Sequence, residues 1–573
     1  MMRLPWRTGA EDVRSPPAQV APRLTSFVKE GVRIALGDDD EMVDRSRKST
    51  LKHIGRLVLL AGLAATAPAL SGCAVSKDDV HRWEGTERGP EKLVAVVTHD
   101  KYALELRTEA ALSLIRMKPR NGKRIGIDMM LHALEGLDEE SRKKIVNGMV
   151  PELVKNIEAP APARTPEGAV PPDPSIPYKD ATFGMLSHEP PLATDEKAKA
   201  DLVAALIKWV QTDFEARIEN SAQAYGVEQM ARFLGAPAVK GLPPLMNDNS
   251  TKIDRIAGLI ADIGDAETKT KGGEQLVALA KLIDSPAWIE KQKGLVNEAN
   301  KKAGNTVSPE ALQKQLTIFQ DQELTKVFAA MKRIGGRAVV EYCLVYSANK
   351  QNSEDRRKAS LAALEGRIEK GNTADIDKIF EIAKDESTPD SIRSLAFNRL
   401  GELPKEQVVP KLYTLFDNKR WKVRWVAAEL VLKTMTTKGL PDFMRKLPAS
   451  AITKMGMSEP ITYAGVIQKM EAPKGEPSPK DAIAPYLGAR ELGPKLVALA
   501  FYYGGKKSDL SVIQSYESDR TPVPKCETDD QCGWSCDVPK AGAAPGSNET
   551  ETKTIGTVGE FVKYCVEPSL TDK

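Results

Sequence analysis

Apolar residues in the middle of the chain recur with helical spacing and come in paired stripes. Within residues 373–400, Ile376 and Ile379 share one helical face, and Ile392 and Leu395 share another after a short polar turn. Each stripe is long enough for an amphipathic helix of about three turns. The pattern therefore predicts a helical hairpin.

The following segment repeats this hairpin, with Val409 and Leu412 in a first stripe and Val423 and Val426 in a second. Two amphipathic helices cannot bury both stripes by themselves, so neighbouring hairpins must stack. Helical periodicity also covers residues 80–155. The predicted fold class is all-α: an α-solenoid of stacked helical hairpins, with a small disulfide-bearing C-terminal tail.

The expected second helices share an arginine followed three residues later by a small residue. A polar residue seven positions before the arginine can cap the second helix and meet the arginine two turns along. The small residue lets adjacent helices approach closely. The arginines are Arg107, Arg255, Arg356, Arg393 and Arg424, and the earlier polar residues are Asp100, Asp248, Asn349, Glu386 and Asp417.

This arrangement resembles the HEAT repeat (armadillo-like) family, in which a turn aspartate and a second-helix arginine form a ladder between units. The resemblance covers roughly residues 86–150 and 230–435 and implies such a ladder for the residues just named. The last three arginines are spaced 37 and then 31 residues apart, and residues 265–325 give only irregular echoes. Insertions or degenerate repeats are expected there.

A proline-rich stretch interrupts the helical pattern. Residues 160–191 carry nine prolines, which favours a linker or a surface strap over a helix. A ligand strand for a proline-binding partner is the functional alternative.

The N-terminal part has the pattern of a secretory signal. Residues 45–56 are basic, and residues 57–70 are 14 almost entirely apolar residues, too few to cross a bilayer. The sequence Leu70-Ser71-Gly72-Cys73 resembles a bacterial lipobox, which implies that Cys73 carries acyl chains and becomes the mature N-terminus. A buried helix with an incidental cysteine is the alternative. We expect the true start at Met42, after a leader of residues 1–41 without function.

Four cysteines lie in the last fifty residues, which suits an exported protein. Cys526, Cys532, Cys536 and Cys565 predict two disulfides with three possible pairings. A zinc site is the alternative, because Cys532 and Cys536 have acceptable local spacing. Cys343 stands alone in an apolar stretch and is expected to be a buried small hydrophobic residue.

These features divide the chain into segments. The cysteine-bearing tail is expected to cap the last repeat, with recognition of a partner through Trp534 as the alternative. The expected segments are the leader 1–41, a signal peptide 42–72, helical repeats 73–155, a linker 156–194, HEAT-like repeats 195–445, an irregular region with a final helical pair 446–520, and the cap 521–573.

The charge balance and the lack of catalytic motifs argue against nucleic-acid binding and enzyme activity. Of 82 basic and 79 acidic residues, 11 and 8 lie in the first 72, so the remainder is neutral, unlike most nucleic-acid binders. A serine-hydrolase elbow, a phosphate loop and a dinucleotide fingerprint are missing from the sequence, and no histidine pair has metal-ligand spacing. We expect no enzyme activity and no cofactor. Basic clusters at 118–124 and 350–358 suit solvated loops, or contact with anionic lipid or polysaccharide.

The sequence thus predicts a lipid-anchored scaffold or adaptor of the bacterial cell envelope, in the outer membrane, that binds a protein or peptide through its solenoid. Two alternatives stay open. One is a periplasmic enzyme or enzyme subunit with catalysis in residues 265–325 or 447–565, and the other is a purely structural envelope component.

Overall fold

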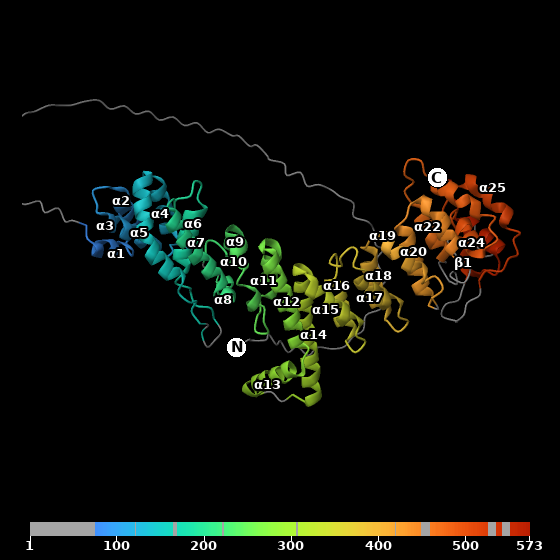
Figure 1. Cartoon of the computed structure of the whole chain (residues 1–573), viewed down its shortest axis with the longest axis horizontal. Helices are drawn as coiled ribbons and strands as arrows, with labels where there is room; N and C mark the ends of the chain where they lie inside the picture. Colours follow the sequence, from blue (N-terminus) through green and yellow to red (C-terminus); the bar gives the residue numbers. More distant parts are fainter. Residues whose placement is uncertain are drawn as a thin grey trace, which may run out of the picture.

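The computed structural model is an elongated stack of helices (Figure 1). No helix of the described chain combines the length and the apolar composition that crossing a membrane requires. The residues described are 75–120, 122–163, 165, 169–220, 223–304, 307–418, 420–447, 459–524, 534–540 and 550–572.

The N-terminal third consists of seven helices that pack as successive hairpins. Polar side chains start several of them: Asp138 accepts a hydrogen bond from the backbone N–H of Ser141 at the start of one helix, and Asp195 accepts one from Ala198 at the start of another. The elements are α1 (Lys77–Trp83), α2 (Gly89–Thr98), α3 (Leu104–Arg116), α4 (Ile125–Glu135), α5 (Glu139–Ile157), α6 (Ile176–Ser187) and α7 (Glu196–Gln211).

The middle of the stack contains an insertion. Helix α13 leaves the stack and projects to one side of the long helix α14, as Figure 1 shows. This insertion lies within residues 265–325, where the repeat pattern is irregular. The elements are α8 (Phe214–Ile218), α9 (Val227–Leu234), α10 (Ala236–Val239), η1 (Pro243–Leu245), α11 (Ile253–Ile263), α12 (Ala266–Ile283), α13 (Pro286–Lys302) and α14 (Pro309–Ile334).

Regular hairpins resume after α14. Gly335 and Gly336 end α14 sharply. Their φ angles are positive, 71° and 97°, and this backbone conformation favours glycine. The elements are α15 (Arg337–Ala348), α16 (Glu354–Ala363), α17 (Thr373–Lys384), α18 (Asp390–Gly401), α19 (Lys405–Tyr413), α20 (Trp421–Lys433), η2 (Thr437–Gly439), α21 (Leu440–Lys446) and α22 (Glu459–Gln468).

The C-terminal end combines short helices with one antiparallel pair of strands, in which Cys536 faces Lys553 in the register. The elements are α23 (Pro479–Ile483), η4 (Ala484–Tyr486), α24 (Leu492–Ala500), η5 (Lys507–Asp509), α25 (Leu510–Ile513), η6 (Gln514–Tyr516), β1 (Ser535–Pro539), β2 (Thr550–Thr554), α26 (Val558–Phe561), the π-helical turn η8 (Val562–Val566) and η9 (Glu567–Ser569).

The helices form two layers. The second helix of each hairpin packs on the second helix of the next, in the order α14, α16, α18, α20, α22, α24, while α12, α15 and α17 pack in the same way in the other layer. One apolar core runs without a break from Val80 to Leu570. The predicted fold class, an α-solenoid with a disulfide-bearing tail, is confirmed.

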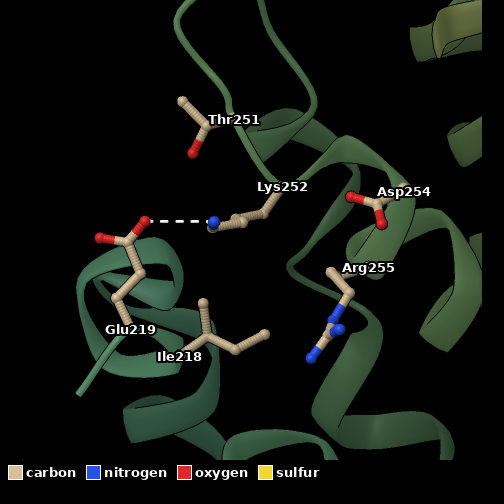
Figure 2. Close-up of a pocket in the computed structure, with 6 residues that line it drawn as sticks. All are labelled: Ile218, Glu219, Thr251, Lys252, Asp254 and Arg255. Atoms are coloured by element: carbon tan, nitrogen blue, oxygen red, sulfur yellow. Dashed lines mark ion pairs between the residues drawn. The ribbon is translucent and has the colours of Figure 1, made fainter. Parts of the chain in front are cut away.

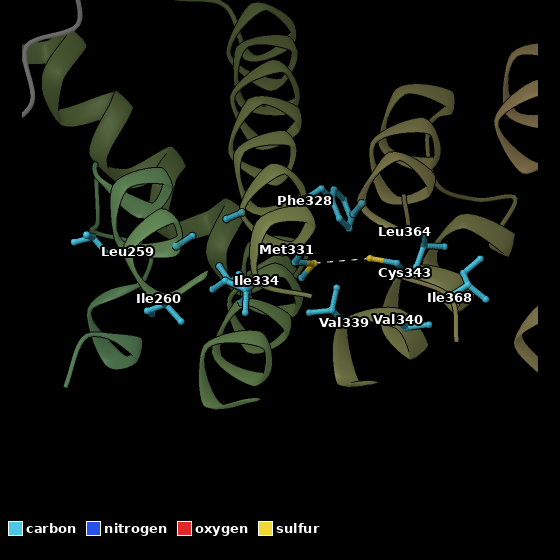
Figure 3. Packing of buried hydrophobic residues seen from close by; sticks show 14 of the residues in the cluster. Leu259, Ile260, Phe328, Met331, Ile334, Val339, Val340, Cys343, Leu364 and Ile368 are labelled. Atoms are coloured by element: carbon cyan, nitrogen blue, oxygen red, sulfur yellow. Dashed lines mark hydrogen bonds between the residues drawn. The ribbon is translucent and has the colours of Figure 1, made fainter. Parts of the chain in front are cut away.

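The packing between α11, α14 and α15 shows how adjacent units share this core (Figure 3). Ile260, Ile334 and Val339 are buried between neighbouring helices. Cys343 is a free buried cysteine, as expected, with its Sγ 3.9 Å from Sδ of Met331. Burial raises the pKa of the Cys343 thiol to about 12, so this thiol stays protonated.

The predicted linker at 156–194 is wrong in part, because residues 176–187 form the buried helix α6, which packs against α4 and α5. Pro177 lies in the first turn of α6, where its missing N–H costs no hydrogen bond. The next proline is Pro190, after the helix has ended. The residues between these two prolines are proline-free, which is enough for three helical turns.

Helix α6 carries a buried ion pair. Lys179 and Asp180 are both fully buried, and Lys179 Nζ lies 2.7 Å from Oδ1 of Asp180. The Asp180 carboxylate also accepts hydrogen bonds from the backbone N–H groups of Ala224 and Tyr225, at 3.0 and 3.3 Å. Burial lowers the pKa of Lys179, and the charge of Asp180 opposes that shift. The pair thus fastens the chain after α8 to the buried helix.

Replacing Lys179 with Met leaves the Asp180 carboxylate buried without its cation. We expect the variant to lose about 3–5 kcal/mol of unfolding free energy in chemical denaturation. The matched control is Lys208→Met, which breaks the exposed pair of Lys208 with Glu158 (2.7 Å) and should cost less than about 1 kcal/mol. Equal losses in the two variants would contradict a stabilising role for the buried pair.

Candidate functional site

Two of the five predicted second-helix arginines, Arg107 and Arg393, are bound to the first helix of their own hairpin. Arg107 Nε donates to the carbonyl of Val97 (2.8 Å), and Arg393 Nε donates to the carbonyl of Ala383 (3.2 Å), which is also ten residues earlier. Both arginines are buried. They satisfy carbonyl groups at the C-terminus of the first helix, where the helix itself provides no donors.

The predicted aspartate–arginine ladder differs from these contacts. No ion pair between described residues joins Asp100 to Arg107 or Asp248 to Arg255. Asp248 is bound by Lys291, and Arg255 Nε contacts Glu228 Oε1 at 2.6 Å. Farther along the stack, Arg424 donates to the carbonyl of Asn418, and Asp417 is exposed.

Arg356 is displaced from the repeat position by one residue. Its neighbour Arg357 makes the buried bond to a carbonyl ten residues earlier, that of Ser347 (2.7 Å). Arg356 instead connects three helices, because its guanidinium contacts Asp284 after α12 (2.9 Å), Gln320 in α14 (2.6 Å) and Asp321 in α14 (2.5 Å). These contacts surround the point where α13 leaves the stack.

Several contacts between successive units lie at the N-terminal ends of the second helices. Asp390 at the start of α18 binds Lys422 of α20 (2.7 Å), and Glu354 at the start of α16 accepts a hydrogen bond from Ser391 of α18. A carboxylate at a helix N-terminus is also favoured by the helix dipole. The structure thus contains a polar ladder, but other residues form it.

A groove opens between α18 and α20, because α18 packs more extensively on α16 than on α20. Its volume is about 400 Å³. The groove is lined by Ser394, Phe397, Asn398, Gly401, Glu402, Val426, Glu429, Leu430 and Lys433.

The floor of this groove is apolar and its charges are already paired. Phe397 is buried, and a Cβ at Gly401 would lie 3.2 Å from Cδ1 of Leu430, so a larger residue there would narrow the groove. At the rim, Glu429 pairs with Lys433 at 2.6 Å. Such a floor with a neutral polar rim suits an apolar side chain of a partner.

A second, smaller pocket of about 230 Å³ lies between the end of α8 and the start of α11 (Figure 2). Lys252 points toward Glu219, with Nζ 3.2 Å from Oε1, and Arg255 is held by Glu228. Nearby, the Glu215 carboxylate accepts a hydrogen bond from the backbone N–H of Thr251 (2.8 Å). Paired cations of this kind give the pocket no net attraction for an anion.

The C-terminal cap contains the disulfide Cys536–Cys565, one of the pairings that the sequence left open. Cys526, Cys532 and Cys73 lie outside the described residues. Trp534 is buried and packs edge-to-face on Phe561, with ring centroids 5.6 Å apart. Trp534 therefore belongs to the interior of the cap and is not displayed to a partner.

Two carboxyl groups meet where the cap joins the stack. The side chain of Glu567 in η9 lies against that of Glu517, and the pKa of Glu567 is raised by burial and by the neighbouring Glu517, while Lys563 opposes the shift. Gly559 also packs directly on the Glu517 backbone, leaving no room for a Cβ. The contact therefore favours the protonated form of Glu567.

Several residues of the basic clusters at 118–124 and 350–358 are engaged by acidic residues of the chain itself. Lys350 binds Asp385 at 2.6 Å, Lys358 binds Asp355 at 2.7 Å, and Arg124 is half-buried near Asp180. Lys118 and Lys123 in the first cluster are exposed. Among the described residues, no group of three or more His, Cys, Asp or Glu side chains is placed to hold a metal ion.

Comparison with known proteins yields structural neighbours but no family. No protein-family model and no curated protein matches this chain. Karyopherin Kap121p bound to the extreme C-terminus of the protein phosphatase Cdc14p is similar with 13% identity, a TM-score of 0.26, and coverage of 78% of this chain and 43% of the karyopherin.

A microtubule polymerase structure with tumor overexpressed gene (TOG) domain arrays has 10% identity and a TM-score of 0.20, and the match covers 74% of this chain and 90% of that one. Kap121p bound to Ste12p has 12% identity and a TM-score of 0.21, with coverage of 78% of this chain and 48% of the karyopherin. This chain spans about half the length of the karyopherin chains that it matches.

Substituting Arg356 with Ala should loosen the base of the α13–α14 insertion, because Asp284 and Asp321 lose their common cation. We expect a loss of about 2–3 kcal/mol in unfolding free energy and faster proteolysis between α12 and α13. The control is Arg255→Ala, since Arg255 is half-exposed and its pair should contribute less than about 1 kcal/mol. An equal effect of both substitutions would contradict this difference.

Glu567→Gln tests the carboxyl pair. The pKa of Glu567 is higher in the folded protein than in the unfolded chain, so folded-state stability is greatest below the unfolded pKa and falls as pH rises toward the folded pKa. The variant should therefore slow amide hydrogen exchange in residues 555–570 at pH 7 and leave it unchanged near pH 4. Exchange unchanged at both pH values would argue against the pair. The control is Glu471→Gln in an exposed loop.

Proposed function

We propose that this chain is a lipid-anchored scaffold or adaptor of the bacterial cell envelope, and that it binds a protein partner through the groove between α18 and α20. The observation that carries the proposal is the groove itself: an apolar floor of Phe397, Val426 and Leu430, open to solvent between two repeat units.

The form of the groove favours a segment of a protein as its ligand. The second helices α18 and α20 supply its two walls, and a groove between two helices can accept the apolar face of a helix or an extended peptide. The rim charges are neutralised within the scaffold, by Glu429 with Lys433 and by Glu402 with Arg399 (2.8 Å). An apolar anchor flanked by uncharged polar residues would therefore enter without leaving a buried charge unpaired.

Asn398 gives the groove a polar contact for orienting such a segment. Its side chain is exposed at the groove, and within the described part of the chain no hydrogen bond occupies it. A side-chain amide offers both a donor and an acceptor to a peptide backbone. The Ser394 hydroxyl, one turn earlier, donates a hydrogen bond to the carbonyl of Asp390 (2.8 Å).

The proposed location rests on the sequence and on the cap. The apolar segment 57–70 followed by Cys73 has the order of a lipoprotein signal, and two or more acyl chains anchor a protein stably. The Cys536–Cys565 disulfide is typical of proteins in oxidising compartments. These observations support an exported, tethered protein.

Site-specific photo-crosslinking in the native envelope tests the groove. A photoreactive residue at Asn398 should form a covalent adduct with one discrete protein, whereas the same residue at Lys378, exposed on α17, should not. A second substitution, Val426→Asp, places a charge on the groove floor and should reduce the Asn398 adduct about tenfold or more. An adduct of the same yield in the Val426→Asp variant would refute binding through this groove.

A further inference from the structure

Two loops meet at the N-terminal end of the stack and form a basic edge. The edge consists of residues 86–92, which cover the end of the α1–α2 connection and the first turn of α2, and residues 117–123, which follow α3. The Arg120 guanidinium holds the loops together, because Nη1 donates to the carbonyl of Glu87 (2.8 Å) and Nη2 to that of Thr86 (2.5 Å). The edge is therefore a fixed feature of the fold.

The loop after α3 is itself rigid. The backbones of Arg120 and Lys123 exchange two hydrogen bonds of 2.9 Å, which closes a tight turn. Gly122 in this turn has a φ of 77°, a conformation that favours glycine. Lys123 in the turn and Lys118 just before it are exposed.

The charge of this edge differs from that of the chain as a whole. The two loops carry five cations and two carboxylates, Glu87 and Glu91, a net charge of +3, whereas the chain after residue 72 is neutral overall. Arg88, Lys118 and Lys123 are exposed, and no ion pair within the described residues engages them. The nearby carboxylate Glu84 is bound by Arg116 at 2.9 Å. These three cations thus remain available to an anionic surface.

An aromatic side chain adjoins the same edge. Trp83 ends α1, is half-buried, and lies with its ring centroid 5.3 Å from Nζ of Lys92. Its carbonyl touches Gly89 so closely that a Cβ there would overlap the oxygen. Tryptophan beside lysine and arginine is the composition found at membrane–water interfaces.

We propose that the edge formed by Arg88, Lys118 and Lys123 rests on the anionic phospholipid headgroups of the bilayer to which the chain is tethered. This inference rests on the proposed lipid anchor, because Cys73 is only 15 residues before Arg88 and would keep the edge near the headgroups. The contact orients the solenoid with its N-terminal end at the membrane. The groove between α18 and α20 lies far along the stack from that end (Figure 1).

Vesicle flotation with the purified chain from residue 74 onward tests the proposal. All samples thus lack the acyl chains and the basic and apolar segments 45–70, and the vesicles are either 30% phosphatidylglycerol in phosphatidylcholine or phosphatidylcholine alone. Arg88→Gln/Lys118→Gln/Lys123→Gln should weaken partitioning onto the anionic vesicles about 100-fold, since each basic residue near an anionic surface contributes about fivefold. The parent should also bind less as salt increases.

The matched control removes the same charge elsewhere. Lys370→Gln/Lys378→Gln/Lys405→Gln changes three exposed lysines of the α16–α19 region and should leave anionic-vesicle binding within about twofold of the parent. Equal binding by the edge variant and the parent overturns the inference, and so does an equal loss in both triple variants, which would indicate net charge alone. Binding of the parent to both vesicle types alike also overturns it.

The lipid anchor is measured separately, by intact mass of the mature wild-type protein. An acylated N-terminal Cys73 supports the proposed function. A mature protein that retains residues before Cys73 without acyl chains refutes the anchor but leaves the vesicle comparison interpretable. An acylated protein whose edge variant still binds anionic vesicles like the parent refutes the edge alone.

Discussion

Burial of paired apolar stripes between neighbouring hairpins is the constraint on which this molecule depends. A single hairpin covers one stripe and leaves the other exposed, so every unit needs the next one. The single core that runs from Val80 to Leu570 is the result. At its ends the stack must cover its last apolar surfaces, and α1 does so at one end and the disulfide-bearing cap does so at the other.

Stacking of this kind also buries backbone carbonyl groups at the helix ends, and arginine side chains donate hydrogen bonds to them. The carbonyls that end a first helix have no intrahelical donor, and Arg107, Arg357 and Arg393 each supply one from ten residues later in the chain. The side chain crosses within its own hairpin, so the bond fixes the angle between the two helices of a unit. Bonds between units include both buried and exposed ion pairs: Asp375 of α17 is fully buried and pairs with Arg337 of α15, whereas Asp390 of α18 and Lys422 of α20 pair at the surface. The extent of packing between successive units varies along the stack.

That variation is where function can arise in a repeat protein. Where α20 separates from α18, an apolar floor is exposed to solvent, and where α13 is inserted, Arg356 gathers Asp284 and Asp321 to hold its base. At the N-terminal end, Arg120 joins two loops into a basic edge. A membrane contact at that end and a protein contact at the groove would place one chain between two surfaces, with the rigid stack setting the distance.

The sequence by itself determined the helical hairpins, their stacking and the second-helix positions of Arg107 and Arg393, because helical periodicity and capping are local and repeat along the chain. It misplaced Arg356 by one residue, since two adjacent arginines satisfy the same pattern and only packing decides which one turns inward. It treated α6 as linker because proline content over a wide window obscured a helix whose single proline, Pro177, lies in the first turn. The choice of Cys536 with Cys565, the burial of Trp534 and the groove beside Phe397 were decided by tertiary structure alone. Each depends on how far two distant segments approach, and no local pattern of residues encodes that distance.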